Sequence, residues 1–294
     1  MARVTLDPKL DIVFKLLFAA ERNRGILRSF LMAVLKPPSP IDVLTINNPT
    51  IPGSDQLKRQ VILDVHVVLR DGQHIDVEMQ ARRHGGPRPR WLFNWGAVFT
   101  DQLDSGHEFA QLKPVVCIII MDFLEFQSPR FHSTFRVLEV HTHEEFSQHL
   151  EIHTLELPKL HQVTADADGD AVLIWGRFFA AETDEELEQL AMNHPEIAPA
   201  TIALETLSQD PAARELARQR RLAELDYLSG IDEARAEGKA EGKAEGLRDA
   251  IRQLCHLLKI ELDVDQQQRL ACSSIEELLE LQEALFKDRR WPDR

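Results

Sequence analysis

Apolar residues near the start of the chain recur every three or four positions, which is the spacing of one face of a helix. They are Leu10, Val13, Phe14, Leu17 and Phe18. Asp7-Pro8 precedes them and predicts an Asp cap with proline in the first turn. A second helical pattern covers residues 24–35 and ends before Pro37-Pro38, because proline is not tolerated inside a helix. The chain therefore begins with two predicted helices.

Strand patterns follow at 41–46, 61–69 and 74–80, each rich in β-branched residues. Asp71-Gly72 separates the last two segments and predicts a tight turn that joins them into a hairpin. The continuous apolar run at 115–121 is typical of a strand buried on both faces. These segments predict a central sheet.

A loop rich in Gly, Pro and Arg covers residues 82–90, and the apolar spacing over 91–103 then predicts a helix. Weaker strand patterns occupy 131–140 and 151–157. The order of helices and strands predicts an α/β fold whose central sheet is partly antiparallel and partly parallel, with helices flanking it.

From Asp184 onward the patterns are almost wholly helical, so the sheet-containing core is followed by a mostly helical C-terminal extension. Two amphipathic helices are expected near the end of the chain, at 247–260 and 275–286, around a connection at 261–274. The expected organisation is a core at 1–160, a helical extension of it at 161–230, a repeat segment at 231–246 and a small helical domain at 247–294.

The repeat segment contains Ala-Glu-Gly-Lys at 236–239 and again at 240–243, followed by Ala-Glu-Gly at 244–246. Two interpretations are equally compatible with it. Glycine costs about 1 kcal/mol per helical position, which favours a marginal, solvated linker. The same small residues would allow another helix to approach closely, which favours a stem for association of two copies.

Composition and hydropathy narrow the class of protein. The chain has 294 residues, 44% hydrophobic and 28% charged, which is ordinary for a soluble protein with two folded units. The longest apolar stretch, 114–123, is too short to span a membrane, and the N-terminus does not resemble a signal peptide. A soluble, cytoplasmic protein is expected. Its three cysteines form no CxxC pair, so neither a disulfide framework nor a structural zinc site is indicated.

The net charge of −14 is unusual for a protein that binds nucleic acid. The charge is unevenly distributed, however. Residues 1–160 contain 18 Lys and Arg against 19 Asp and Glu, whereas residues 161–294 contain 16 against 29. The acidity therefore lies in the second half, and screening limits the reach of exposed charges to about 8 Å at physiological salt.

A group of acidic residues lies around the predicted hairpin. Alternation along a strand places Asp76, Glu78 and Gln80 on one face of the segment 74–80. If the hairpin forms, Asp64 on the preceding segment lies nearly opposite Glu78. Opposed carboxylates repel unless a cation lies between them, so these residues predict a divalent metal site. The alternative is that the acids face solvent on a half-exposed hairpin.

Mg²⁺ is the cation expected there, because it prefers oxygen ligands and uses one or two carboxylates together with water and phosphate. Mn²⁺ or Ca²⁺ would suit the same ligands. Asp64 and Glu78 are the expected metal ligands, with the backbone carbonyl of Met79 as a third, and the Gln80 amide would orient a water or a phosphate oxygen. Such a centre could catalyse hydrolysis of a phosphodiester.

The motifs, taken in order, resemble a known family. They are Asp7-Pro8-Lys9-Leu10-Asp11-Ile12-Val13-Phe14-Lys15, Leu63-Asp64-Val65, Val77-Glu78-Met79-Gln80, Arg90, Gly106-His107-Glu108-Phe109 with Leu112 and Pro114, and Leu155-Glu156-Leu157-Pro158-Lys159. This series resembles the recombination-promoting nuclease and transposase family of bacteria, within the PD-(D/E)XK nuclease superfamily. The resemblance extends from about Leu6 to about Lys159.

The resemblance implies a restriction-endonuclease-like core that cleaves DNA with a metal ion. It implies Asp64 and Glu78 as metal ligands, places Gln80 where the superfamily more often has Lys, and adds Asp11 as an acidic partner of the site. Because a glutamine carries no charge, it cannot stabilise a transition state as a lysine can, so slow catalysis is expected.

The only dense basic cluster follows Gln80 directly. Its arginines, which are candidates for DNA phosphate contacts, are Arg82, Arg83, Arg88 and Arg90. A solvated loop would explain them equally well. Arg90 is the strongest candidate because it fits the family pattern and begins a helix. Lys15 is a further DNA-binding candidate from the Phe-Lys pair of the family motif.

The function expected from these observations is a Mg²⁺-dependent deoxyribonuclease, an endonuclease that acts in DNA recombination or in mobile elements. DNA is the expected partner, and a homodimer through the helical C-terminal region would suit cutting of both strands. The rival hypothesis is a catalytically weak protein that keeps the nuclease fold for binding or assembly while its helical tail recruits partners. The acidic composition and the missing lysine favour that rival.

Overall fold

The computed structural model describes residues 5–47, 50–51, 61–62, 64–83, 85–103, 108–162 and 170–292. Three residues of the motif series, Leu63, Gly106 and His107, lie outside this set. The chain divides into two compact units, residues 1–221 and residues 222–294. The expected domain boundaries at 160, 230 and 246 stay predictions.

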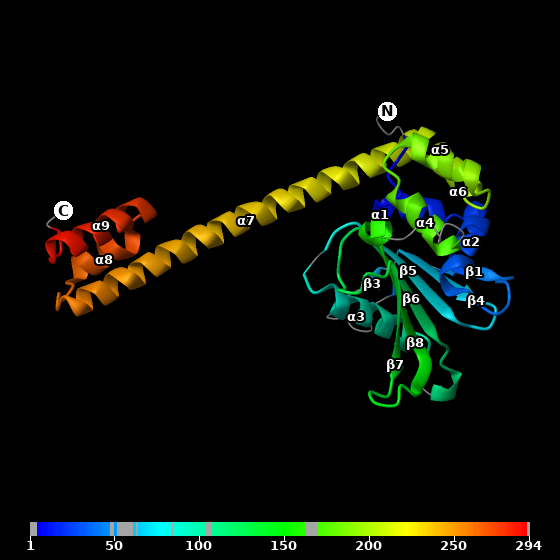
Figure 1. Cartoon of the computed structure of the whole chain (residues 1–294), viewed down its shortest axis with the longest axis horizontal. Helices are drawn as coiled ribbons and strands as arrows, with labels where there is room; N and C mark the ends of the chain where they lie inside the picture. Colours follow the sequence, from blue (N-terminus) through cyan, green and yellow to red (C-terminus); the bar gives the residue numbers. More distant parts are fainter. Residues whose placement is uncertain are drawn as a thin grey trace. The chain divides into compact units, whose positions relative to one another are not determined.

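A mixed six-stranded sheet forms the centre of the first unit (Figure 1). Its strands, in spatial order, are β1 (Leu44–Asn47), β4 (Val65–Leu69), β5 (His74–Gln80), β6 (Val115–Met121), β8 (Glu145–Glu156) and β7 (His132–Leu138). The pairs β5–β6 and β6–β8 are parallel, and the other neighbours are antiparallel. The predicted central sheet, partly parallel and partly antiparallel, is thus confirmed.

The predicted hairpin joins β4 to β5. Gly72 adopts a φ of 89°, a left-handed conformation that favours glycine, and its N–H donates to the carbonyl of Leu69. The single strand predicted at 61–69 was wrong, because the segment is divided. β3 (Val61–Ile62) pairs with β2 (Thr50–Ile51) in a separate ribbon, and β4 begins only at Val65.

Helices cover both faces of the sheet. On one face, α1 (Asp11–Phe18) and α2 (Arg24–Leu35) pack against alternate residues of β4, β5 and β6. On the other, α3 (Pro87–Thr100) packs against β6 through Trp91 and Val98. Since β6 is buried on both faces, its continuous apolar sequence is explained.

The starts of α1 and α3 differ from the predicted ones. Helix α1 begins at Asp11 and has Leu10 as its N-cap, whereas Asp7 accepts the N–H of Lys9 in a turn before the helix. The prediction of Asp7 as the cap was therefore wrong. Helix α3 begins four residues earlier than predicted, because Pro87 provides a favourable first helical residue.

Three further helices complete the first unit: α4 (Ala171–Ala180), α5 (Asp184–Asn193) and α6 (Ala198–Gln209). They share one hydrophobic core with α1 and α2. Within it the Trp175 ring lies 5.5 Å from that of Phe30 and 5.8 Å from that of Phe18. A Cβ on Gly176 would approach the Phe131 ring within 2.5 Å, so glycine is required where α4 crosses that ring.

Helix α7 (Pro211–Leu257) contains the boundary between the two units. In the second unit, its C-terminal part packs with α8 (Val264–Cys272) and α9 (Ile275–Asp288) around Ile251, Leu278 and Leu285. The connection predicted at 261–274 therefore contains a helix, which begins with a capping box of Asp263 and Gln266. Among the described residues, no helix is both long and apolar enough to cross a membrane.

Candidate active site

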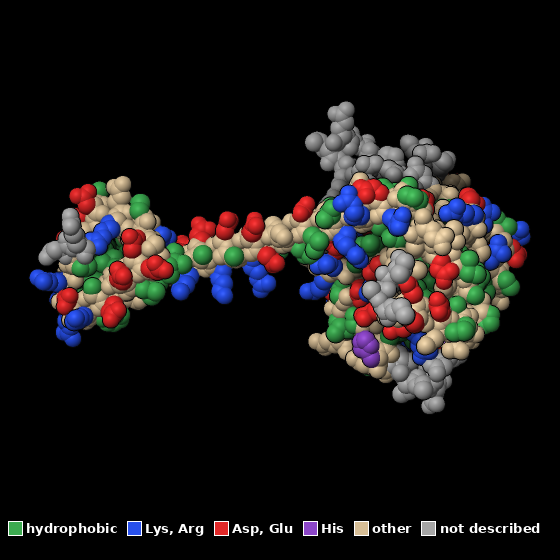
Figure 2. Space-filling model, turned by 90° about the horizontal axis from the view of Figure 1, so that it is seen from above, with side chains coloured by type: hydrophobic (Ala, Val, Ile, Leu, Met, Phe, Trp, Pro, Cys, Tyr) green, Lys and Arg blue, Asp and Glu red, His purple; other side chains and the backbone are tan. Residues whose placement is uncertain are grey.

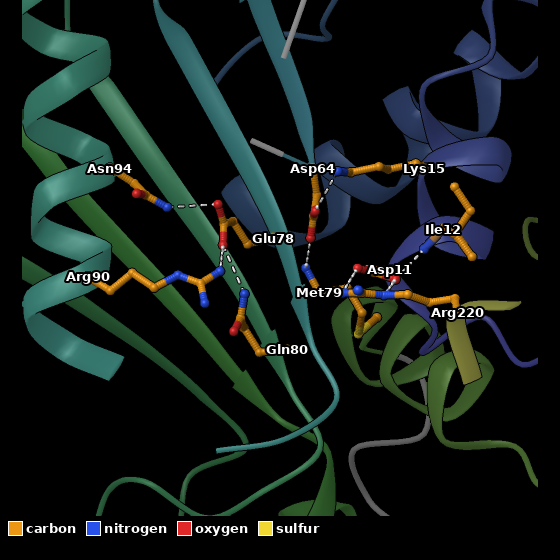
Figure 3. A network of polar contacts seen from close by, with 10 residues as sticks. All are labelled: Asp11, Ile12, Lys15, Asp64, Glu78, Met79, Gln80, Arg90, Asn94 and Arg220. Atoms are coloured by element: carbon orange, nitrogen blue, oxygen red, sulfur yellow. Dashed lines mark hydrogen bonds and ion pairs between the residues drawn. The ribbon is translucent and has the colours of Figure 1, made fainter. Parts of the chain in front are cut away.

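The acidic residues of the hairpin gather where β4 begins and β5 ends (Figure 3). Val65 pairs with Val77, so the next position outward brings Asp64 beside Glu78, as the turn predicted. The valines of this pair belong to the core under α1 and α2. Glu78 instead points to the α3 face, where Asn94 contacts it.

Asp64 is held by groups from two elements. Its Oδ1 lies 3.1 Å from the Lys15 Nζ on α1, and its Oδ2 accepts the backbone N–H of Met79 at 2.9 Å. The side chain is 12% exposed. Burial raises the pKa of Asp64, although Lys15 and the Met79 N–H favour the charged form and partly oppose this effect.

Glu78 is more deeply enclosed, with its side chain 3% exposed. Asn94 donates to Oε1 at 2.9 Å, while Gln80 donates to Oε2 at 2.9 Å and Arg90 reaches the same oxygen at 3.5 Å. Burial, followed by the negative charge of Asp64, raises the pKa of Glu78 to about 7. Near neutral pH this carboxyl is therefore divided between its charged and neutral forms.

Asp76 is a third acid of this group, to which the sequence analysis gave no role. It is 1% exposed, and among the described residues its Oδ1 has no hydrogen-bond partner. Burial, Glu78 and Asp64 together raise its pKa well above the usual range. Strand alternation had already placed it on the face of Glu78 and Gln80, so that alternation was the available signal.

Asp11 approaches the centre from α1 and is partnered there. Both of its carboxylate oxygens accept hydrogen bonds from Arg220 on α7, one of them at 2.8 Å. Its Oδ1 also accepts the N–H of Ile12. Because the negative charge of Asp11 contributes to the raised pKa of Asp64, Asp11 is close enough to influence the centre electrostatically.

Most of the basic residues predicted to bind DNA contact carboxylates of different residues. Lys15 contacts Asp64, and Arg90 contacts Glu78. Arg83 and Arg88 both donate to Glu125, a residue that sequence reasoning missed. Arg82 lies next to Arg83, two residues after the end of β5. DNA binding by these five residues stays a prediction.

The ligand chemistry fits a divalent cation that prefers oxygen. Asp64 and Glu78 supply carboxylate oxygens, and the Oδ1 of Asp76 on the same strand as Glu78 is a further oxygen that has no hydrogen-bond partner among the described residues. Within the described parts of the chain, no three His, Cys, Asp or Glu side chains form a metal-binding group. A cation held by Asp64 and Glu78 would therefore complete its ligands from backbone carbonyls, water or substrate, as is usual for Mg²⁺.

Comparison with known proteins agrees with this arrangement. A model of the PD-(D/E)XK nuclease family transposases matches residues 8–234. The chain belongs to this family. The match includes the carboxylates of the hairpin and extends beyond the resemblance at 6–159 through α4, α5, α6 and the start of α7. No curated protein and no solved structure matches the chain.

Membership in the PD-(D/E)XK nuclease family transposases supports a nuclease-like or mobile-element function and the binding of DNA. Asp11 and Arg220 both lie within the range that the family model matches. The helical segment at 161–234 therefore lies within the family match.

Proposed function

We propose that the chain is a metal-dependent DNA endonuclease that hydrolyses phosphodiester bonds in recombination or in a mobile element. The observation that carries the proposal is the placement of Asp64 beside Glu78, with Lys15 and Arg90 supplying positive charge on either side. Carboxylates buried next to each other lower the stability of the fold, and such an arrangement is typical of a site that binds a cation.

Asp64 and Glu78 would hold the cation, Mg²⁺ foremost, with the Met79 carbonyl as an additional oxygen ligand. When bound, the cation would polarise the scissile phosphate and offset the negative charge that develops on it. Gln80 donates its amide N–H to Glu78, which leaves the amide oxygen to accept a hydrogen bond from the attacking water. Arg90, 49% exposed, can contact a DNA phosphate while it stays beside Glu78.

Lys15 has three ammonium hydrogens, of which Asp64 takes one. The others can reach a phosphate oxygen, which agrees with the predicted role of Lys15 in DNA binding. The same ammonium supplies positive charge at the reaction centre, where Gln80 supplies none. Lys15 is therefore proposed to take part in catalysis together with Asp64 and Glu78.

The direct test is nicking of supercoiled plasmid by the full chain with Mg²⁺, with Mn²⁺, with Ca²⁺ and with chelator. Asp64→Asn and Glu78→Gln keep the size of each side chain and remove its charge. Asp42→Asn is the matched control, because Asp42 is exposed and lies before β1, away from these carboxylates. Metal-dependent nicking that both site variants lose and the control keeps is the expected result.

A binding or assembly protein with a nuclease fold is the second candidate. The observation that favours it is the enclosure of Glu78 by Asn94, Gln80 and Arg90, since these donors compete with a cation for its oxygens. Calorimetric titration with Mn²⁺ separates the two candidates. Binding that Asp64→Asn abolishes supports the nuclease, whereas no metal binding and no nicking by the unchanged chain would support the assembly protein.

We also propose that the chain forms a homodimer through its helical C-terminal region. Along the repeat, Glu237 and Lys239 lie two residues apart, and hence about 200° around the helix. The same offset recurs in the next repeat, so Figure 2 shows acidic side chains along one side of this stretch of α7 and basic ones along the other. The acidic side of one copy could then pair with the basic side of another.

A further inference from the structure

A loop at residues 122–126, called here the anchored loop, connects β6 to the region of Arg83 and Arg88. It begins directly after Met121, where the N–H of Asp122 donates to the carbonyl of Gln80. Lys9 of the N-terminal turn lies 2.8 Å from Asp122 and fixes this end of the loop. The loop therefore starts beside the end of β5, the strand that carries Glu78.

The other end of the anchored loop rests on a buried ion pair. Glu156, which is fully buried, accepts the backbone N–H groups of Glu125 at 2.6 Å and Phe126 at 3.1 Å. Lys159, 3% exposed, pairs with Glu156 and donates to the Phe126 carbonyl at 2.9 Å. A buried pair that also satisfies three backbone groups holds its surroundings in one conformation.

Above this support, the Glu125 side chain joins two arginines. Its Oε2 accepts the Nε–H of Arg83 at 2.8 Å, and its Oε1 accepts the Nε–H of Arg88 at 2.7 Å. Arg88 also donates to the Glu125 carbonyl, and its guanidinium lies 4.6 Å from the centre of the Phe126 ring. Burial acts to raise the pKa of Glu125, but the hydrogen bonds from the two arginines lower it overall, so the carboxylate is charged.

The geometry leaves the arginines available to a ligand. The Glu125 side chain is 3% exposed, whereas Arg83 is 62% and Arg88 is 55% exposed. Each arginine uses its Nε toward the carboxylate, so terminal guanidinium hydrogens can still point outward. Arg88 lies in the first turn of α3, and Arg90 and Asn94, further along the same helix, contact Glu78.

We propose that Glu125 is a positioning residue that holds Arg83 and Arg88 as a preorganised pair for DNA phosphates beside Glu78, with Glu156 and Lys159 fixing Glu125 in turn. The inference rests on the proposed function, because it needs DNA as the ligand. An arginine whose guanidinium is already oriented loses less conformational freedom when it binds a phosphate.

Positioning and simple charge have effects of opposite sign, which makes the inference testable. Glu125→Gln removes a negative charge next to the predicted DNA path. If Glu125 acted only through its charge, this change would strengthen DNA binding. If Glu125 positions the arginines, the same change weakens binding, because the amide oxygen can accept from one arginine and its NH₂ group repels the other.

The experiment measures the affinity of the full chain for a fluorescent DNA duplex by anisotropy, with chelator present so that no cleavage occurs. Four proteins form a cycle: the unchanged chain, Glu125→Gln, the double variant Arg83→Gln with Arg88→Gln, and the triple variant. Glu145→Gln is the matched control, since Glu145 is an acid at the far end of the β7–β8 hairpin. Thermal unfolding of each protein reports whether it is folded.

The expected result is a three- to tenfold weaker binding by Glu125→Gln, no change in Glu145→Gln, and no further loss when Glu125→Gln is added to the double variant. Equal or tighter binding by Glu125→Gln would overturn the inference and leave the nuclease proposal intact. An additional loss in the triple variant, equal to the loss in the single variant, would also overturn it, because Glu125 would then act without the arginines. Failure of the unchanged chain to bind DNA would overturn both proposals.

Discussion

The ammonium of Lys15 lies 3.1 Å from Oδ1 of Asp64, which joins helix α1 to the start of strand β4. This contact brings a positive charge to the carboxylates of a centre in which the Gln80 side chain carries none. The Lys15 side chain is 28% exposed, so it keeps access to a substrate.

Lys15→Gln should therefore lower the rate of cleavage more than the affinity for DNA. We expect kcat to fall by about 10²–10³-fold, the effect of losing one electrostatic stabiliser, and DNA binding to weaken only a few-fold. Single-turnover cleavage and anisotropy measure the two quantities. Lys36→Gln is the control, because Lys36 pairs with Asp170 and is 61% exposed. An unchanged kcat with weaker DNA binding would show that Lys15 contacts a DNA phosphate and has no part in catalysis.

Glu78→Gln should stabilise the metal-free protein above neutral pH. The Glu78 pKa is raised from 4.5 to about 7, so between these values the folded state holds a proton that the unfolded chain has released. The free energy of unfolding therefore falls as pH rises through this window and stays reduced above it. A shift of this size corresponds to roughly 3 kcal/mol, an upper value for the gain, because the variant also loses contacts with Arg90 and Gln80.

Urea unfolding of the unchanged chain and of Glu78→Gln at pH 5 and pH 8, with chelator, tests this expectation. The stability advantage of the variant should be larger at pH 8 than at pH 5, and Glu145→Gln should show no such difference. A variant that is less stable by the same amount at both pH values would contradict the raised pKa of Glu78, because it would show that the contacts to Asn94, Gln80 and Arg90 offset the burial of the charge.

Local features of the sequence were enough to predict that Asp64 lies near Glu78. The Asp71-Gly72 turn sets the register of the hairpin, and alternation sets the face of each side chain, so both follow from residues close together in the chain. The same alternation placed Asp76 on that face. It could not reveal that Asp76 is buried, because the helix that covers this face, α3, comes later in the chain.

The contacts that sequence reasoning missed join distant segments. Arg220 follows Asp11 by 209 residues, and Glu156 supports Glu125 from the end of another strand. Such pairs depend on how helices and loops pack, and no periodicity marks them. The helix cap predicted at Asp7 was wrong because a capping pattern marks a turn but does not fix the residue at which the helix begins.

Asp11→Asn should affect metal binding less than Asp64→Asn. Arg220 already occupies both oxygens of Asp11, so Asp11 is expected to act on the cation through its charge rather than as a direct ligand. We expect a loss of about tenfold or less in Mn²⁺ affinity, against more than 100-fold for Asp64→Asn, because an ion loses more when a direct ligand is removed. Calorimetric titration of both variants measures the difference. Equal losses would make Asp11 a direct ligand.

Arg220→Gln provides the reciprocal test. It frees the Asp11 carboxylate, so Mn²⁺ affinity should rise or stay unchanged. The ion pair is partly exposed, with Arg220 54% and Asp11 28% exposed, so its loss should lower the free energy of unfolding by no more than about 1 kcal/mol. A lower Mn²⁺ affinity in a folded Arg220→Gln protein would instead indicate that Arg220 holds α1, and with it Lys15, in place.

Glutamine at Gly238, Gly242 and Gly246 should separate a solvated helix from a dimer stem. A Cβ on any of these glycines would meet no heavy atom within 4 Å, so the single chain accommodates larger side chains there. Since glycine costs about 1 kcal/mol in a helix, the three changes should raise the helix content of a monomer and its resistance to heat. In a homodimer whose helices approach closely at these positions, the same changes create clashes.

Sedimentation over a range of concentrations, with circular dichroism, measures both effects. From the proposed homodimer we expect the unchanged chain to dimerise at micromolar concentrations and the triple glutamine variant to remain monomeric while its helices stay formed. Ala236→Gln with Ala240→Gln is the matched control, because these exposed residues lie on the same helix but two positions away, on another side. If all three proteins have the mass of a dimer, the glycine face is not part of the interface. If the unchanged chain is itself a monomer, the repeat segment is a solvated helix.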